Sequence, residues 1–252
     1  MILLAYALAR FVNLPGAALG VQLPGFYLNL QLNVHTVVAL LVALLTATGA
    51  DWLLREHPAL GKGSTIEHWL LPALTAWVIG IPLFQVPLGP LWWAGFAIGG
   101  AFLMLVLVAE YIVVDSEDVR QPVAAGGLTV LSFALYLILA ITLRIAGLRA
   151  YLLVPGLALS IGLVSLRTLH LRLHGRWAFT PAGVIALLTA QIAAALHYLP
   201  ITPVTYGLLL LGPAYALTSL LANLAEDVPL RQALVEPALV LVIVLGAAWL
   251  TR

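Results

Sequence analysis

The sequence predicts an all-α bundle of eight or nine membrane-spanning helices, forming a single domain over residues 1–252. Of its residues, 63% are hydrophobic and only 8% are charged, with a mean hydropathy of +1.10, whereas a soluble domain carries about a quarter charged residues. Apolar runs close to the roughly 20 residues needed to cross a bilayer recur along the chain. All 10 carboxylates fall in three connectors, or within about one turn of them, on one side of these runs. We therefore expect one charged face and one nearly uncharged face.

Residues 1–33 leave two alternatives open. They form either a short, proline-broken span near 2–19 followed by an interfacial stretch, or a segment that lies wholly in the membrane interface. The chain starts without a basic n-region, and Arg10 interrupts its first apolar run. A cleaved signal peptide is therefore not expected.

From residue 34 onward, turn residues separate the predicted spans. Pro87, Gly89 and Pro90 close one hairpin of helices, and Pro200 with Pro203 closes another, because proline and glycine favour turns. No alternation with period two is recognised, so transmembrane β-strands are not expected. The predicted spans are 34–54, 66–87, 90–114, 122–144, 149–171, 180–200, 203–223 and 232–251.

Basic residues predict the orientation, because those in short connectors tend to stay in the cytoplasm. Seven share the side of the carboxylates and three lie on the other side, while the side of Arg10 depends on the first segment. The charged face is therefore predicted to be cytoplasmic, in the inner membrane of a cell. The seven are Arg55, Lys62, Arg120, Arg167, Arg172, Arg176 and Arg231, and the three are Arg144, Arg149 and Arg252.

Short similar segments indicate a parallel repeat of two four-span units, 34–144 and 149–251. Glu117-Asp118 recurs as Glu226-Asp227 at an offset of 109 residues, and Pro90 opens a span as Pro203 does at an offset of 113. The alternative is that helices rich in leucine and alanine match one another by chance.

Two clusters of charged side chains on the predicted cytoplasmic face form the first candidate site. Carboxylate oxygens in such clusters can hold a divalent cation or bind a cationic segment of a partner. The alternative is a solvated connector whose acids and arginines pair with little effect on stability. The clusters are Glu110, Asp115, Glu117, Asp118 and Arg120, and then Asn223, Glu226, Asp227, Arg231 and Glu236.

Two of these carboxylates lie inside their spans and need a partner or a wet cavity. They are Glu110 and Glu236. Arg120 and Arg231 are the partners that sequence proximity predicts for them.

One stretch of the first cluster resembles the aspartate-rich segment of UbiA-type intramembrane prenyltransferases. Asp115-x-x-Asp118 is followed by Arg120-Gln121-Pro122 and then by two glycines. The resemblance covers about a dozen residues and implies binding of magnesium and a prenyl diphosphate. Val114 replaces the asparagine that precedes the motif in that family, and the second aspartate-rich motif is reduced to Glu226-Asp227. Too many spans precede the first motif and too few follow it.

A basic segment at the end of one span forms the second candidate site. Two histidines at i, i+4 share a helix face, as a metal site requires, but the arginines around them repel a cation. Contact with anionic lipid headgroups is therefore favoured, and no metal site is predicted. The segment contributes Arg167, His170, Arg172, His174 and Arg176.

Other side chains receive structural interpretations. His35, His68 and His197 lie near span ends, where interfacial histidines with water partners are the default and haem or pigment ligands are the alternative. Tryptophans near span ends, among them Trp92 and Trp93, indicate an aromatic belt. The stripe Gly95-x3-Gly99 indicates close helix packing, within the bundle rather than between subunits.

These features leave three classes of function open. The first is a non-catalytic membrane module, either a scaffold subunit or a holder of lipid, quinone or pigment, which the thin polar lining of the spans favours. The second is a transporter of a hydrophobic or amphipathic solute, and the third an intramembrane enzyme acting on a lipid diphosphate. Membrane lipids and membrane-protein subunits are the expected partners. A net charge of +1 argues against nucleic acid, the absence of cysteine excludes thiol chemistry, and no cofactor is indicated.

Overall fold

The computed structural model describes residues 17–23, 26–32, 34–60, 65–115, 117–173 and 175–251, with side chains from Val37 onward. The chain divides after Val114 into two compact units. Unit 1 ends at Val114 and unit 2 begins at Asp115.

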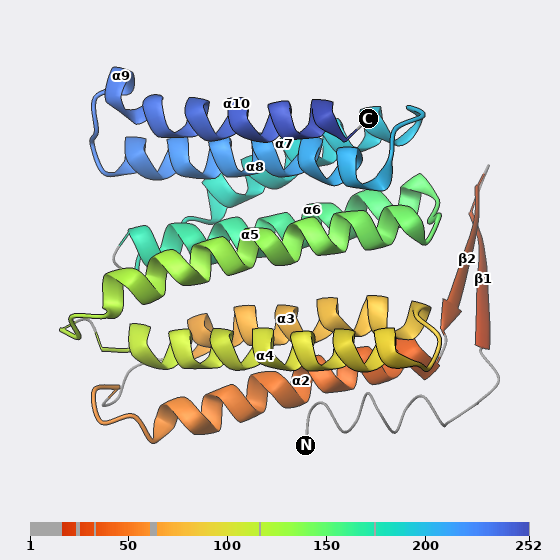
Figure 1. Cartoon of the computed structure of the whole chain (residues 1–252), viewed down its shortest axis with the longest axis horizontal. Helices are drawn as coiled ribbons and strands as arrows, with labels where there is room; N and C mark the ends of the chain where they lie inside the picture. The colour runs from red at the N-terminus through yellow and green to blue at the C-terminus, as the bar shows by residue number, and fades with distance from the viewer. Residues whose placement is uncertain are drawn as a thin grey trace. The chain divides into compact units, whose positions relative to one another are not determined.

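Within the described ranges, eight helical segments are long and apolar enough to cross a membrane, which confirms the predicted all-α polytopic bundle (Figure 1). Their ends agree with the predicted spans to within three residues, and the last span is interrupted at Leu234. Pro90 and Pro203 open their helices, where the missing N–H of proline has no cost. The helices are α2 (Val34–Arg55), α3 (Ile66–Gln85), α4 (Pro90–Val113), α5 (Gln121–Ile145), α6 (Ala150–Arg172), α7 (Phe179–His197), α8 (Pro203–Ala225), α9 (Leu230–Ala233) and α10 (Val235–Leu250).

A β-hairpin precedes the helices and differs from what the sequence predicts. Strands β1 (Ala17–Leu23) and β2 (Phe26–Leu32) pair antiparallel, with Leu19 opposite Leu30 and Val21 opposite Leu28. Phe-Tyr-Leu-Asn-Leu-Gln-Leu in β2 alternates apolar and polar residues with period two, which is the pattern of a strand. The expectation that no segment alternates in this way was therefore wrong. The predicted span near 2–19 falls mostly outside the described residues.

In unit 1, α3 packs against both α2 and α4. Ile79 and Leu83 of α3 form a buried cluster with Trp92 and Leu103 of α4. The opposite flank of α4 is apolar and exposed. An exposed apolar flank of this kind suits contact with lipid tails.

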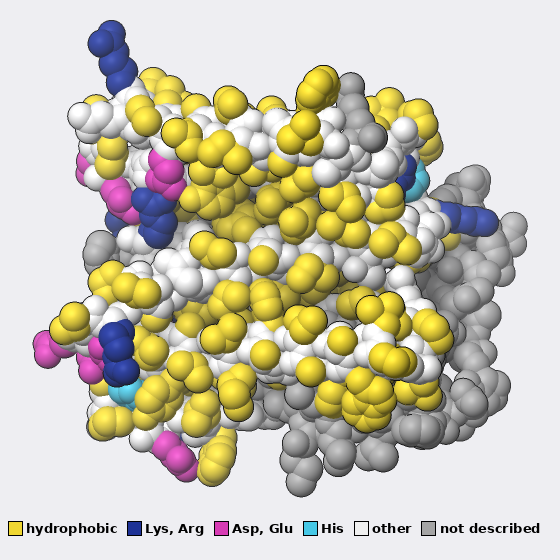
Figure 2. Space-filling model, viewed as in Figure 1, with side chains coloured by type: hydrophobic (Ala, Val, Ile, Leu, Met, Phe, Trp, Pro, Cys, Tyr) yellow, Lys and Arg dark blue, Asp and Glu magenta, His cyan; other side chains and the backbone are white. Residues whose placement is uncertain are grey.

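In unit 2, α8 packs against α5, α7 and α10, and α6 packs against α5 and α7. Buried hydroxyl groups of this unit mostly bond within their own helix, as Ser160 does to the Gly156 carbonyl and Thr218 to the Ala214 carbonyl, both at 2.8 Å. These two hydroxyl groups are satisfied within their own helices, and Arg167, His170 and Asn223 are also buried in this unit. Figure 2 shows yellow side chains along the helix flanks and magenta side chains at helix ends.

The division into units does not follow the predicted repeat. Unit 1 contains three of the membrane-spanning segments and unit 2 contains five, whereas the repeat predicts four in each half. The break falls at the connector after α4 rather than the one after α5. The duplication of 34–144 and 149–251 stays a prediction.

Trp92 departs from the predicted aromatic belt. Its side chain is 2% exposed, and its indole Nε1 donates a hydrogen bond of 3.0 Å to the carbonyl of Leu83. That carbonyl has no helical donor, because the residue four positions later is Pro87. Its neighbour Trp93 is 59% exposed, as a belt residue should be.

Replacing Gly99 by alanine is expected to destabilise unit 1 by about 1–3 kcal/mol, the cost of overpacking a tight contact. A Cβ at Gly99 would lie 2.5 Å from Cγ2 of Ile79, and a β-branched side chain has little freedom to move. Gly95→Ala, one turn earlier, is the matched control, because its Cβ would lie 3.6 Å from Leu83. Thermal unfolding in detergent micelles measures both. Equal melting temperatures would contradict internal packing of this stripe.

Candidate functional site

Unit 1 holds a buried polar pair between α3 and α4. His68 Nδ1 lies 2.6 Å from Glu110 Oε2, and the two side chains are 8% and 1% exposed. The two atoms are within hydrogen-bond distance, and in a buried site such polar groups are expected to be paired. Sequence proximity pointed to Arg120 as the partner of Glu110 and to an interfacial, water-bound His68. Both predictions were wrong, because each of these side chains supplies the polar partner that the other needs inside the span.

The α2 end of unit 1 carries a second, more exposed polar group. Arg55 Nε donates to Asp51 at 2.8 Å, and the Thr65 hydroxyl also donates to Asp51. These contacts join the end of α2 to the start of α3. They are structural contacts, and they lie at the charged end of these two helices.

Asp115 and Asp118, which carry the resemblance to the prenyltransferases, shape the connector before α5. Asp115 accepts the backbone N–H of Glu117 at 3.0 Å, and Asp118 accepts both Nε and Nη2 of Arg120 at 3.1 and 2.9 Å. The hydrogen bonds to Asp118 raise the pKa of Arg120 above its ordinary value. Among the described residues, no group of three acidic or histidine side chains is placed to hold a metal ion.

Arg172, at the end of α6, lies at the centre of a hydrogen-bonded network in unit 2. Its Nη2 donates to Asn223 Oδ1 at 2.6 Å, and its Nε donates to Glu226 Oε1 at 3.3 Å. Weaker contacts run from Nη1 to Ser219 at 3.4 Å and from Nη2 to Glu226 at 3.5 Å. Asn223 in turn donates to the carbonyl of Ala233 at 3.0 Å. The network ties α6, α8 and α9 together and fixes the guanidinium.

Two other residues of the segment that was predicted to contact lipid headgroups are buried instead of exposed. Arg167 is 1% exposed and His170 is 7% exposed, so neither presents a surface that a lipid headgroup could touch. The His170 ring packs 4.4 Å from the Trp177 ring. Arg176 is exposed, and His174 lies outside the described residues.

The second acidic cluster surrounds the end of α8 and the start of α10. Asp227 adopts a positive φ of 58° where α8 ends, and it is exposed, as is Arg231. The Tyr215 hydroxyl donates to Glu236 Oε1 at 2.7 Å. The partner of Glu236 is therefore Tyr215 and not the predicted Arg231.

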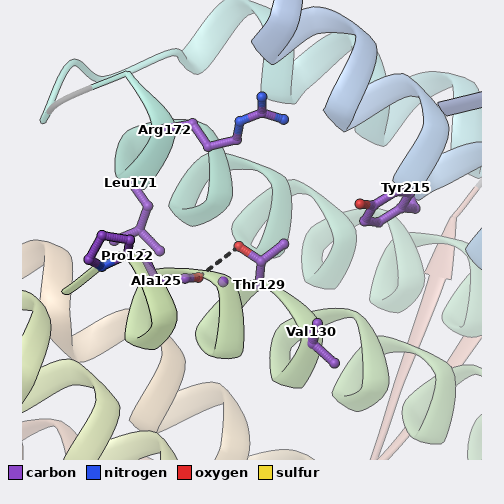
Figure 3. A pocket seen from close by; sticks show the side chains of 8 residues that line it. Pro122, Ala125, Thr129, Val130, Leu171, Arg172 and Tyr215 are labelled. Carbon is purple, nitrogen blue, oxygen red and sulfur yellow. Dashed lines mark hydrogen bonds between the residues drawn. The ribbon is translucent and has the colours of Figure 1, made fainter. Parts of the chain in front are cut away.

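A hollow of about 410 Å³ lies between α5, α6 and α8. One face of α5 forms its wall, since the contributing residues recur at i, i+3, i+4, i+7 and i+8. The Thr129 hydroxyl donates to the Ala125 carbonyl at 3.0 Å, so this wall presents mostly apolar surface. Figure 3 shows Arg172 and Tyr215 beside the hollow, which Pro122, Ala125, Gly126, Thr129, Val130 and Leu171 also line.

At the opposite end of unit 2, Arg144 is held by backbone. Its Nη1 donates to the His197 carbonyl at 2.8 Å and its Nη2 to the Leu199 carbonyl at 3.0 Å. The guanidinium also lies 5.0 Å from the Tyr206 ring centre. These contacts close the α7–α8 turn. The side chain of His35 lies outside the described residues, so its interpretation as an interfacial histidine stays a prediction.

The apolar helices and the charged connectors define an integral membrane protein with several spans. The chain belongs to the family described as "Protein of unknown function (DUF5656)", whose model matches residues 14–251. No curated protein and no solved structure matches it.

Sequence reasoning did not identify Tyr215 or the apolar residues of α5 as parts of a site. Pro122, Gly126 and Val130 do share one helix face at spacings of four, which is a signal present in the sequence. It is not distinctive, because small and apolar residues lie on every face of a membrane helix. The contacts of Arg172 and Tyr215 are what single this face out.

Proposed function

We propose that this protein is a non-catalytic membrane module that holds an amphiphilic lipid in the hollow between α5, α6 and α8. The observation that carries the proposal is the combination of an apolar wall with a fixed arginine beside it. A lipid has the same two parts, an apolar chain and a polar head. Val130 of the wall is 69% exposed, so a chain could reach the hollow from the surrounding lipid.

The size and position of the hollow support this proposal. Ligand sites typically have volumes of about 300–1,000 Å³, and the hollow is about 410 Å³. Arg172 stands at the end of its span on the connector side that carries the carboxylates. An arginine at that depth reaches the headgroup level of a bilayer. We further propose, from the distribution of basic residues, that this side is cytoplasmic.

Replacing Gly126 by leucine is expected to reduce the lipid that copurifies with the protein at least severalfold, because the new side chain fills the hollow. Gly127→Leu is the matched control, since Gly127 does not line the hollow. A Cβ at either position meets no atom within 4 Å, and both changes favour the helix by roughly 0.5–1 kcal/mol. Native mass spectrometry of gently extracted protein measures the bound lipid.

The same spectra and one activity assay test the other functions. Equal lipid content in the two variants would contradict the proposed site. A copurifying quinone, pigment or partner subunit would replace the lipid proposal with one of those alternatives. Magnesium-dependent activity lost in Asp115→Asn and Asp118→Asn would indicate the prenyltransferase-like enzyme instead.

A further inference from the structure

From the charges beside the hollow, we infer that it selects a zwitterionic lipid whose headgroup carries a phosphate and a primary ammonium. This inference rests on the proposed function and adds the chemistry of the head. Arg172 and Tyr215 line the hollow, and each is hydrogen-bonded to a glutamate, Arg172 to Glu226 and Tyr215 to Glu236. Together these side chains supply both hydrogen-bond donors and hydrogen-bond acceptors.

The donor side is the Arg172 guanidinium. Its side chain is 30% exposed, and it has five N–H donors. The contacts with Asn223, Ser219 and Glu226 use four of them. One N–H on Nη1 therefore has no partner among the described side chains. A phosphate oxygen is the acceptor that suits an arginine donor at the membrane surface.

The acceptor side is the Tyr215–Glu236 pair. The Tyr215 hydroxyl uses its hydrogen on Glu236 Oε1 at 2.7 Å, so its oxygen still offers lone pairs toward the hollow that Tyr215 lines. Glu236 Oε2 has no hydrogen-bond partner within the described part of the chain. A primary ammonium has three N–H donors for these oxygens, whereas a quaternary ammonium has none.

The charge balance of this group disfavours an anionic headgroup. These contacts involve one arginine and two carboxylates, Glu226 and Glu236, so the three side chains together are net negative when all are ionised. A headgroup with only negative charge meets repulsion there. A headgroup that pairs a phosphate with an ammonium meets a complementary partner on both sides.

The test is a lipid titration of the full chain in detergent, read by native mass spectrometry. The probes are phosphatidylethanolamine, phosphatidylcholine and phosphatidylglycerol with identical dioleoyl chains. We expect the ethanolamine lipid to bind about tenfold more tightly than the other two, the size of effect that a hydrogen bond to a charged group supplies. Glu236→Gln should remove most of that preference. Arg172→Gln should weaken binding of all three lipids.

Controls keep the proposals separate. Arg149→Gln, exposed at the other end of α6, and Glu56→Gln, exposed in unit 1, should bind as the unsubstituted protein does. Equal binding of the three headgroups, or preference for the glycerol lipid, would overturn the headgroup inference. If Gly126→Leu then still abolished binding, the proposed lipid site would stand. Absence of saturable binding for every lipid would overturn both.

Discussion

Replacing Glu110 by alanine is expected to lower the free energy of unfolding by about 3 kcal/mol, the lower end of the cost of breaking a buried pair. The substitution leaves His68, whose side chain is 8% exposed, without the carboxylate 2.6 Å from its Nδ1. His68→Ala should cost a similar amount for the reciprocal reason. Glu56→Ala, at an exposed position between α2 and α3, should change stability little. Reversible unfolding in detergent micelles or bilayer discs measures all three.

The coupling free energy between the two side chains indicates whether their hydrogen bond is neutral or charge-assisted. Neutral hydrogen bonds between membrane helices couple by about 0.6 kcal/mol on average and by no more than about 1.7 kcal/mol. We expect a double-mutant cycle of His68→Ala and Glu110→Ala to exceed that upper value, because both side chains are buried and a histidine and a glutamate can form a charge-assisted bond. A coupling near 0.6 kcal/mol would instead assign a neutral bond.

An apolar replacement of the whole pair gives an independent check. His68→Leu combined with Glu110→Leu should restore most of the stability that either single change loses, since a buried ion pair and a packed apolar pair are often of equal stability. If the double variant folds well but the protein loses a cellular function, the charge serves function rather than folding. If the double variant is as unstable as the single variants, overpacking rather than charge governs this site.

The spans could be predicted because length and hydropathy determine them directly. The prediction of 90–114 matches α4 at Pro90–Val113, and the prediction of 122–144 matches α5 at Gln121–Ile145. Proline at the start of α4 and α8 marks the boundaries for a local steric reason. None of this information depends on contacts between distant parts of the chain.

The rotation of each helix about its own axis could not be predicted in the same way. A membrane helix is apolar toward lipid and toward its neighbours, so the pattern that separates inside from outside in a soluble helix is weak. His68 and Glu110 are 42 residues apart, and nothing local indicates that they face each other. Arg167 illustrates the same limit, because an arginine among other arginines indicates an interface while its side chain is buried.

The β-hairpin was missed for a different reason. Its strands do alternate apolar and polar residues, but each has only seven residues, fewer than the roughly 9–11 that a membrane-crossing strand needs. The hairpin therefore does not have the length pattern of membrane-crossing strands. The sequence signal for these strands was the alternation of apolar and polar residues over a few positions.

Trp92→Ala is expected to be about as damaging as the loss of Glu110, lowering the free energy of unfolding by about 3 kcal/mol. The change leaves a cavity where the Trp92 ring stacks on Phe96 at 5.2 Å, and it removes the indole donor to the Leu83 carbonyl. Pro87 has no N–H to replace that donor. Trp93→Ala, the adjacent and 59% exposed residue, should cost far less, because its ring faces the surroundings of the helix in both the folded and the unfolded protein.

Trp92→Phe separates the two contributions. It keeps most of the ring packing but leaves the Leu83 carbonyl without its donor, which costs about 1–3 kcal/mol for a buried polar group. Trp93→Ala should therefore be the most stable variant, Trp92→Phe the next and Trp92→Ala the least stable. Thermal unfolding under one detergent condition measures this order. If Trp92→Ala and Trp93→Ala proved equal, Trp92 would belong to the exposed aromatic belt that the sequence predicts, and the packing of α3 on α4 at this position would be wrong.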